Sequence, residues 1–248
     1  MLYSAKHNFL YIKTKKTASS TAECALEYLI RGEMHAKPTN CILYPDGSRI
    51  GYRGNNPEDD PNHGSSAFFR SHMSAEEIKK LVGSEIFKKS IKISSIRNPY
   101  SMCISAFHHF GNQPVERHQR AKENSYPNFT KEKFENFMLT QEKKITKGFS
   151  DRHFCLQGSF IVDMLIRQEF FKDDLRMVLE KLKIPSETSE YILNNFLSMK
   201  VSKRKNSALE PVDYYTDKSF EIVNNIYANW FKWGNYQKAS ELGGLRSV

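Results

Sequence analysis

Two patterns of hydrophobic and polar positions alternate along the chain. Short apolar runs bounded by polar or turn residues predict buried strands. Longer segments, in which apolar residues recur three and four positions apart, predict helices, because such residues share one helix face. The predicted strands are 9–13, 68–70, 91–96 and 161–167, and the predicted helices are 20–30, 74–83, 99–110, 130–139, 171–183, 186–198 and 216–234.

Local signals support the starts of two of these helices. Ser74 and Glu77 have the spacing of a capping box, in which each side chain binds the other residue's backbone amide, and the helix should end near Gly83. Pro99 interrupts the strand before it and suits the first turn of a helix. These boundaries therefore rest on hydrogen-bonding chemistry as well as on periodicity.

The alternation of strands and helices predicts an α/β fold with a central, mainly parallel sheet flanked by helices. We expect a single domain over residues 1–248, with loop-rich insertions near 38–70 and 111–150. The first insertion is rich in Pro and Gly and is expected to contain a short hairpin at Asp46-Gly47. A basic loop is expected at 200–213.

The charge balance narrows the class of partner. Lys and Arg number 37 against 28 Asp and Glu, which gives a formal net charge of +9 and a pI of about 9.2. A basic protein favours anionic partners, such as nucleotides and sulfated or phosphorylated glycans. The positive charge is dispersed and forms no long arginine-rich run, so nucleic acid is not an expected partner.

Cysteine usage and hydropathy bear on other classes. The cysteines are widely spaced and form no CxxC pair, so a structural zinc site is not expected. No run approaches the ~20 apolar residues of a membrane span, and no secretory signal is visible. We therefore expect a cytoplasmic protein, or one of the Golgi lumen if an N-terminal anchor is missing from this chain. The cysteines are Cys24, Cys41, Cys103 and Cys155.

The turn between the first strand and the first helix has the composition of an anion site. Lys16 adds a positive charge, and the first amides of a helix, which lack partners within it, favour an anion. No glycine stands between Met1 and Arg31, so the turn differs from the G-x-x-x-x-G-K-[ST] loop of ATP-binding proteins. The alternative is an ordinary turn with a Ser or Thr cap. The hydroxyl donors of the turn are Thr17, Ser19, Ser20 and Thr21.

A second predicted strand ends in an arginine. Arg97 follows strand 91–96, and Ser105 lies about two turns into the next helix. In a parallel sheet, ligands bind beyond the carboxyl ends of the strands, where the Lys16 turn is also expected. An arginine can bind a phosphate bidentately, and a serine hydroxyl can complete the cradle. The alternative is that Arg97 pairs with a carboxylate and Ser105 faces a neighbouring helix.

Together the two segments resemble the nucleotide-binding signatures of the sulfotransferases that use 3′-phosphoadenosine 5′-phosphosulfate (PAPS). Lys16-Thr17-Ala18-Ser19-Ser20-Thr21 matches the Lys-Thr-small-small-[ST]-[ST] loop, with Ser19 where glycine is common. Arg97-Asn98-Pro99-Tyr100, with Ser105, matches the second signature. The resemblance implies a P-loop-like three-layer fold.

Further segments resemble the carbohydrate sulfotransferase branch of this family. Residues 72–78 are similar to its His-containing segment. Residues 163–175 are similar to its D-x-x-x-R-x-E-x-L-x-x-D-L segment, with Phe170-Phe171 in place of the more usual Asn-Leu. Residues 214–217 and Gly234-Asn235-Tyr236 resemble the C-terminal signature. On this basis the expected acceptor is a hydroxyl of a saccharide or glycoconjugate.

The resemblance implies a role for each motif. The loop beginning at Lys16 would bind the 5′-phosphosulfate, and Lys16 would neutralise charge on the bridging oxygen as the sulfuryl group leaves. Arg97 and Ser105 would hold the 3′-phosphate. The basic loop would close over that phosphate or the adenine, with a solvated charge run as the alternative. PAPS is the co-substrate, and no metal is required. The expected nucleotide-binding residues are Lys16, Thr17, Ala18, Ser19, Ser20, Thr21, Arg97, Ser105, Ser202, Lys203 and Arg204.

Transfer to a hydroxyl also requires a general base. Histidine suits this role because its pKa lies near neutrality. His72 is the expected base, since it lies in the matching segment just before a helix start. Glu23, one turn into the first helix, is the alternative, because some sulfotransferase branches use a glutamate. His108 and His109 are further candidates for facing an acceptor, with a solvated position as their alternative.

The resulting hypothesis is in-line transfer of the sulfuryl group of PAPS to a saccharide hydroxyl, and two alternatives stay open. A nucleotide kinase or other phosphotransferase would need a Mg²⁺-binding Asp at a strand end, whereas Asp163 begins a predicted strand. A nucleotide- or glycan-binding protein without catalysis is disfavoured by the presence of both Lys16 and His72.

Overall fold

The computed structural model describes residues 1–33, 40–53, 68–110, 129–145, 151–195 and 209–247. The chain divides into two compact units. The first unit comprises Met1–Ile96 and Asp151–Val201, and the second comprises Arg97–Ser150 and Ser202–Val248. Each unit is described by itself below.

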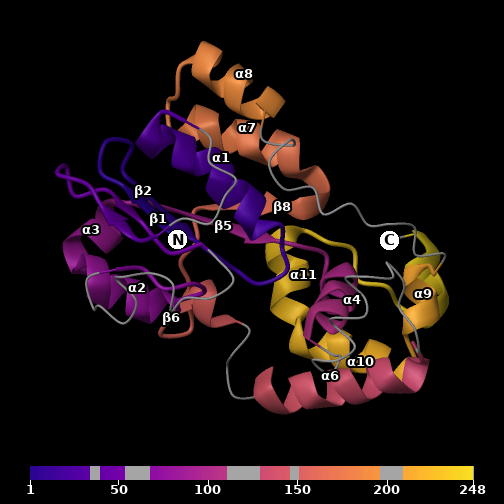
Figure 1. Ribbon diagram of the computed structural model, residues 1–248. Coiled ribbons are helices and arrows are strands. Elements are labelled where there is room, and N and C mark those ends of the chain that lie inside the picture. Colours follow the sequence, from indigo (N-terminus) through magenta and orange to yellow (C-terminus); the bar gives the residue numbers. More distant parts are fainter. Residues whose placement is uncertain (34–39, 54–67, 111–128, 146–150, 196–208, 248) are drawn as a thin grey trace. The chain divides into compact units, whose positions relative to one another are not determined.

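The first unit is built on a six-stranded sheet with the order β3-β4-β1-β2-β5-β8. Figure 1 labels β1, β2, β5 and β8 of this sheet. Strand β5 pairs in parallel with β2 on one side and β8 on the other, which confirms the predicted parallel centre. Strands β1, β4 and β3 continue the sheet in antiparallel pairings, of which the sequence pattern predicted only the hairpin at Asp46-Gly47 that joins β3 and β4. The strands are β1 (Leu2–Ser4), β2 (Phe9–Ile12), β3 (Ile42–Leu43), β4 (Arg49–Ile50), β5 (Ile91–Ile96) and β8 (Met164–Arg167), with β6 (Cys155–Leu156) and β7 (Ser159–Phe160) in a separate antiparallel pair.

Helices cover both faces of this sheet, and the alternation of side chains along β2 explains why. Phe9 and Tyr11 pack into a core formed with α1, α7 and α8. Leu10 and Ile12 point to the other face and pack into a core formed with α2 and α3. Strand β2 is therefore buried on both sides. The helices are α1 (Ser19–Arg31), α2 (Ala75–Val82), α3 (Ser84–Lys89), α7 (Phe171–Lys181) and α8 (Ser186–Asn195), with two short 3-10 turns, η2 (Asp151–His153) and η3 (Gln168–Phe170).

Several local predictions for the first unit are confirmed. Ser74 and Glu77 form the capping box of α2, and the helix ends at Gly83. The hairpin at Asp46-Gly47 connects β3 and β4, and the φ of 86° at Gly47 explains the glycine there.

Other local predictions for this unit are wrong. Residues 68–70 form no strand, although the Phe69 carbonyl accepts a hydrogen bond from the Tyr52 amide. Strand β8 begins at Met164 and not at residue 161. Just before it, the Asp163 amide donates to the Lys92 carbonyl, and the Asp163 carboxylate accepts from the Lys92 amide. A helix after Gly83, α3, was not expected.

The second unit is helical in its described part and is centred on Tyr100. The Tyr100 ring is fully buried and contacts the rings of Tyr215, Phe220 and Phe231. The Tyr100 hydroxyl donates to Asn224 Oδ1 at 2.5 Å, and the Tyr215 hydroxyl donates to the Tyr100 carbonyl at 2.9 Å. The helices are α4 (Pro99–Phe110), α6 (Lys131–Ile145), α9 (Pro211–Tyr214), α10 (Asp217–Ile226) and α11 (Ala228–Gly234), followed by the 3-10 segment η5 (Leu242–Ser247).

The predicted helix 216–234 is interrupted in the structure. Its two parts, α10 and α11, meet at Tyr227, whose φ of −111° and ψ of 19° are not helical. In the C-terminal segment Gly234-Asn235-Tyr236, the first position needs glycine for a steric reason. A Cβ at Gly234 would lie 2.2 Å from the Tyr236 ring. Asn235 takes the left-handed conformation that ends the helix.

The predictions for 111–128 and for most of the basic loop at 200–213 lie outside the described residues. Within the described ranges, no helix combines the length and the apolar character needed to cross a membrane.

Candidate active site

The anion loop, residues 13–21, connects β2 to α1 at the carboxyl end of the sheet's parallel strands. Lys16 and Ala18 have φ values of 62° and 57°, whereas the residues on either side have negative φ. Such alternation turns successive amide groups toward one side and is typical of anion-binding nests. Ala18 is the N-cap of α1, and no side chain caps the helix. The backbone is therefore shaped for an anion without any glycine.

A chain of buried hydroxyls holds this backbone in place. Thr14 Oγ1 donates to the Ser95 carbonyl at 2.6 Å and lies 2.7 Å from Thr17 Oγ1. Ser19 Oγ donates to the Thr14 carbonyl at 2.5 Å. Tyr11 completes the chain, since its hydroxyl donates to the Ser19 carbonyl and lies 2.7 Å from Ser95 Oγ. The loop is thus tied to the carboxyl end of the neighbouring strand β5.

This arrangement changes the predicted roles of two hydroxyls. Thr17 and Ser19 are buried, and their hydroxyls bond within the loop instead of being presented to a ligand. Lys16, Ser20 and Thr21 are half-buried at the surface of the loop. These three side chains and the exposed Lys15, together with the backbone amides, form the part of the loop that a ligand can reach.

Glu23 is engaged in ion pairs, which disfavours it as the general base. The carboxylate is 1% exposed, and Lys13 Nζ donates to its Oε2 at 2.5 Å. The Met1 amino group binds its other oxygen. Burial alone would raise the pKa of Glu23, but the charges of Met1 and Lys13 outweigh it and lower the pKa to about 2. Because the Glu23 carboxylate is buried and bonded to the Lys13 ammonium, it is not presented to an acceptor hydroxyl in this structure.

His72 lies beside the anion loop within the first unit. Its Nδ1 is 3.3 Å from the Lys13 carbonyl. A carbonyl can only accept a hydrogen bond, so Nδ1 carries the proton and Nε2 keeps its lone pair. His72 itself has a φ of 59°, a conformation that non-glycine residues rarely adopt. The arrangement suits a base whose tautomer is fixed by the same loop that would hold the leaving group.

Burial keeps the His72 imidazole neutral. The pKa of His72 is lowered to about 3, mainly by burial and further by the positive charges of Lys13 and Lys15, while the hydrogen bond to the Lys13 carbonyl acts in the opposite direction. A bound anion would offset the two lysine charges and raise the pKa again. No local motif indicates the buried His153 on η2, which also lowers the pKa of His72.

Arg97 and Ser105 belong to the second unit. Arg97 is the first residue after β5 and is 9% exposed, and Ser105 is half-buried on α4. The Asn98 side chain accepts from the Tyr100 amide at 2.9 Å and so starts the helix. The Arg-Asn-Pro-Tyr motif therefore combines an arginine at a strand end, a helix start and the central ring of the second unit.

The segment 163–175 is held together by ion pairs with structural roles. Asp163 precedes β8, and its Oδ2 accepts from the amide and the Nζ of Lys92 at 2.7 and 3.1 Å. Asp174 is 1% exposed and receives both Nε and Nη2 of Arg167, at 2.8 and 2.7 Å. The Arg167 guanidinium also lies over the Phe170 ring. Asp163 is thus engaged at the amino end of its strand and does not support the kinase alternative.

The remaining candidates are placed as follows. His108 Nε2 lies 2.9 Å from the Tyr214 hydroxyl within the second unit, and His109 is exposed. Ser202, Lys203 and Arg204 lie outside the described residues. Among the described residues, no group of three or more His, Cys, Asp and Glu side chains is arranged to hold a metal ion.

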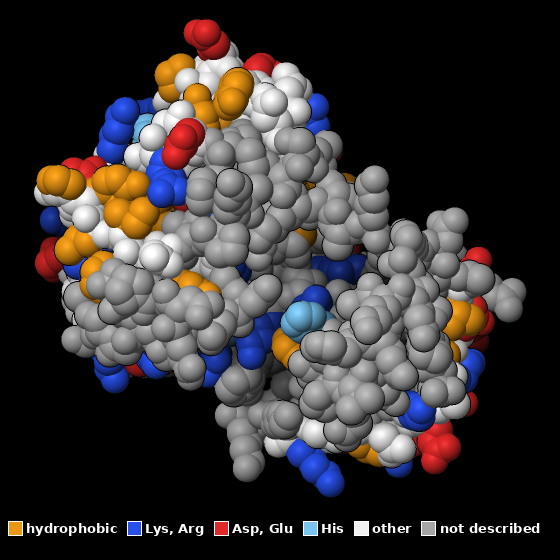
Figure 2. Space-filling view, viewed as in Figure 1, with side chains coloured by type: hydrophobic (Ala, Val, Ile, Leu, Met, Phe, Trp, Pro, Cys, Tyr) orange, Lys and Arg blue, Asp and Glu red, His pale blue; other side chains and the backbone are white. Residues whose placement is uncertain are grey.

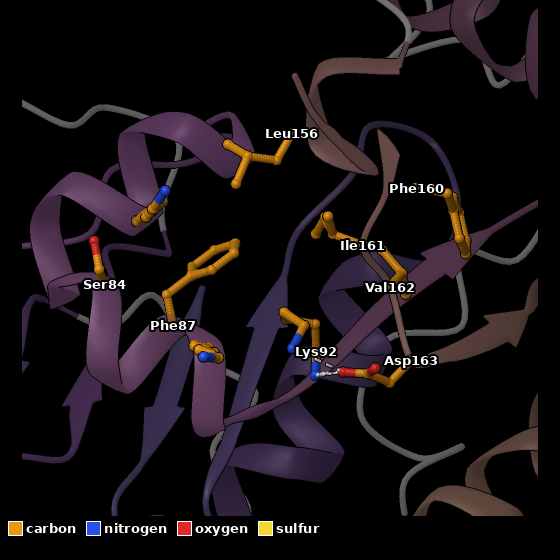
Figure 3. A pocket seen from close by; sticks show the side chains of 10 residues that line it. Ser84, Phe87, Lys92, Leu156, Phe160, Ile161, Val162 and Asp163 are labelled. Carbon is orange, nitrogen blue, oxygen red and sulfur yellow. Dashed lines mark hydrogen bonds and ion pairs between the residues drawn. The ribbon is translucent and has the colours of Figure 1, made fainter. Parts of the chain in front are cut away.

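A cavity of about 480 Å³ lies at the opposite end of the sheet from the anion loop. Figure 3 shows Phe87, Leu156 and Ile161 around it, with the Lys92–Asp163 pair at its edge. Lys92 and Asp163 stand at the amino ends of β5 and β8, whereas the loop follows the carboxyl end of β2. The cavity therefore has no part in the candidate site.

The surface charge agrees with the sequence analysis. On the face that Figure 2 shows, Lys and Arg side chains lie at several separate places, with Asp and Glu side chains among them. Positive charge is thus dispersed on this face.

An α/β unit with a lysine-bearing anion loop beside a histidine has the parts that a group transferase needs. The model of the Sulfotransferase family matches residues 1–232, a range that includes residues of both units, and the chain belongs to this family. The searches of curated proteins and of solved structures gave no match. The chain is accordingly a transferase that moves a sulfuryl group.

Proposed function

We propose that the protein transfers the sulfuryl group of PAPS to a hydroxyl of a saccharide or glycoconjugate. The main support is the anion loop: its backbone is shaped for a phosphate-type anion, and a neutral histidine lies beside it in a chain that matches the sulfotransferase family. The P-loop-like three-layer fold is part of the same proposal, and helices on both faces of the sheet support it.

The reaction is an in-line displacement at sulfur. The acceptor oxygen forms a bond to the sulfur while the bond from sulfur to the 5′-phosphate oxygen breaks. His72 Nε2 takes the proton of the acceptor hydroxyl, and Lys16 with the loop amides neutralises the charge that develops on the departing phosphate. The products are a sulfate ester and adenosine 3′,5′-bisphosphate.

The 3′-phosphate distinguishes PAPS from ATP-like nucleotides, and we assign it to Arg97 and Ser105. This assignment rests on the sequence motif, with the buried arginine directly after β5 as support. The basic loop with Ser202, Lys203 and Arg204 is proposed to close over the same phosphate or the adenine. The saccharide acceptor rests on the resemblance to the carbohydrate branch, and a cytoplasmic location stays a prediction.

Calorimetric titration with adenosine 3′,5′-bisphosphate, and separately with ATP plus Mg²⁺, tests the proposed nucleotide. We expect the bisphosphate to bind more tightly than ATP. Tighter ATP binding with no response to the bisphosphate would contradict the proposal.

The same titration, carried out on variants, tests the phosphate assignment. Arg97→Met should weaken bisphosphate binding roughly 10- to 100-fold, because a hydrogen bond to a charged group contributes about 1.5–3 kcal/mol. Adenosine 5′-phosphate, which lacks the 3′-phosphate, should bind with the same affinity to the native protein and to Arg97→Met. Arg176→Met is the matched control, since Arg176 lies in an exposed pair with Asp173. An equal loss for both ligands would contradict the assignment of Arg97.

A further inference from the structure

His72 has a backbone conformation that needs support. Its φ of 59° falls in the left-handed region, which a non-glycine residue occupies only when its surroundings hold it there. A change in this φ would redirect the imidazole, whose Nδ1 now meets the Lys13 carbonyl. The aim of the ring at the anion loop therefore depends on the contacts of the His72 main chain.

Two side chains of η2 make such contacts. Arg152 Nη2 donates to the His72 carbonyl at 3.3 Å. His153 Nδ1 lies 2.9 Å from the Met73 carbonyl and must be the donor, because a carbonyl only accepts. Consecutive carbonyls of the His72 turn are thus held by consecutive side chains that lie 80 positions further along the chain.

The turn that supplies these side chains is itself anchored. His153 is 5% exposed, and Phe154 beside it is fully buried and stacks on Phe160. The Phe154 amide donates to the Asp151 carbonyl, and the Ile161 amide donates to the Phe154 carbonyl, both at 2.8 Å. Since these contacts hold η2 in place, they also hold the backbone from which the Arg152 and His153 side chains reach the His72 turn.

Burial also keeps the His153 ring in the form that this contact needs. It lowers the pKa of His153 to about 4, and the Met73 carbonyl only partly offsets this. The ring is therefore neutral at physiological pH, with its single proton on the nitrogen that faces Met73.

We propose that Arg152 and His153 are positioning residues, which hold the main chain of His72 and Met73 so that the His72 ring faces the anion loop. The proposal rests on the proposed function in that His72 is taken as the general base. Both residues act through the main chain, and neither exchanges a proton with the substrate.

A double-mutant cycle on kcat tests this role. His153→Phe removes the donor but keeps a ring of similar size, whereas His153→Asn keeps an N–H near the position of Nδ1. We expect His153→Phe to lower kcat at least tenfold with little change in bisphosphate affinity, and His153→Asn to keep most of the activity. In a His72→Ala background, His153→Phe should cause no further loss, because its effect passes through His72. If His153→Phe lowers kcat by the same factor in the His72→Ala protein as in the native protein, the proposal is overturned.

Stability needs its own control, because His153 is buried. Val178→Ala removes buried volume from the same unit, at a core position on α7. This variant should lower the melting temperature while keeping kcat per folded molecule. If His153→Phe loses activity only in proportion to its loss of folded protein, as Val178→Ala does, the residue is structural and the proposal fails.

An NMR titration of the His72 ring separates this proposal from the proposed function. The pKa of His72 should be about 3 in the native protein and should rise toward 6.5 in His153→Phe, as the ring leaves its half-buried place beside Lys13. His153→Asn should raise the pKa of His72 much less than His153→Phe does, because it removes only the charge effect of His153 and keeps the ring in place. This measurement needs no substrate, so it tests the positioning role even if PAPS proves not to be the donor. An unchanged pKa of His72 in folded His153→Phe would overturn the role.

Discussion

At the scale of single residues, the anion loop separates structural hydroxyls from ligand-facing groups. Thr17 and Ser19 look like phosphate donors in the sequence, yet their hydroxyls bond to Thr14. They stabilise the loop in the conformation that turns its amides outward. Lys16 is the charged residue of the motif 16–21, and its side chain is half-buried at the surface of the loop.

Replacement of Lys16 tests the role of this charge. Lys16→Met should lower kcat by about 10²–10³-fold, the usual effect of removing one group that stabilises developing charge. Binding of adenosine 3′,5′-bisphosphate and the melting temperature should change much less. Lys15→Met is the matched control, because Lys15 is the exposed neighbour in the same loop. Steady-state kinetics with purified variants measures the difference, and equal losses in the two variants would argue against a specific role for Lys16.

At the scale of elements, the charged segment 163–175 joins β8 to α7 rather than supplying chemistry. Arg167 at the end of the strand grips Asp174 in the first turn of α7 through two parallel hydrogen bonds. The Arg167 amide donates to the same carboxylate at 2.8 Å. This bidentate pair fixes the angle between strand and helix.

Two neighbouring aspartates allow a controlled test of that contact. Asp174→Asn should lower the free energy of unfolding by about 1.5–3 kcal/mol, because Asp174 is buried and bonded to a charged group. Asp173→Asn should change it by less than about 0.5 kcal/mol, since Asp173 is 76% exposed in its pair with Arg176. Urea unfolding followed by circular dichroism provides the measurement. Similar losses for both variants would show that the pair has no structural role.

Element prediction succeeded where a boundary had its own chemical signal. Strand β5 and helix α4 have the predicted bounds, because Asn98-Pro99 separates them. Strand β1 was missed because three residues are too short to show a period. The break between α10 and α11 at Tyr227 was also missed, because no Pro or Gly stands there to indicate a helix end.

The candidate site was only partly predictable for a related reason. The sequence located the anion loop and His72 through local motifs. It did not reveal that Thr14 binds Ser95, or that Arg152 and His153 hold the His72 turn, because these partners lie about 80 positions apart. Such contacts exist only once the sheet has formed.

At the scale of the whole molecule, two neutral histidines, the half-buried His72 and the buried His153, make stability depend on pH. The pKa values of His72 and His153 are lowered by burial to about 3 and about 4, below the ordinary value of 6.5. Below pH 6.5 the unfolded chain therefore binds protons that the folded protein does not. Stability is highest above this pH and falls as the pH drops toward 4.

Urea unfolding between pH 7 and pH 5 measures this dependence. Each histidine should contribute a slope of up to about 1.4 kcal/mol per pH unit in the acidic part of the range. The double variant His72→Asn/His153→Asn should show a flatter slope than the native protein. His109→Asn, which changes an exposed histidine, should keep the native slope. Carboxylates such as Glu23 titrate below this window, so parallel slopes in native and double-variant proteins would contradict the prediction.

Strand β2 makes the fold far less tolerant of changes in length than of changes in side chain. Alternate residues of Phe9–Ile12 serve opposite cores, and the anion loop begins at the next residue. A one-residue insertion or deletion here would exchange the two faces of the strand and shift every group that follows it. A hydrophobic substitution would leave that register intact. Evolutionary drift in this part of the chain should therefore proceed by replacement, with the spacing from Phe9 to Lys16 kept constant.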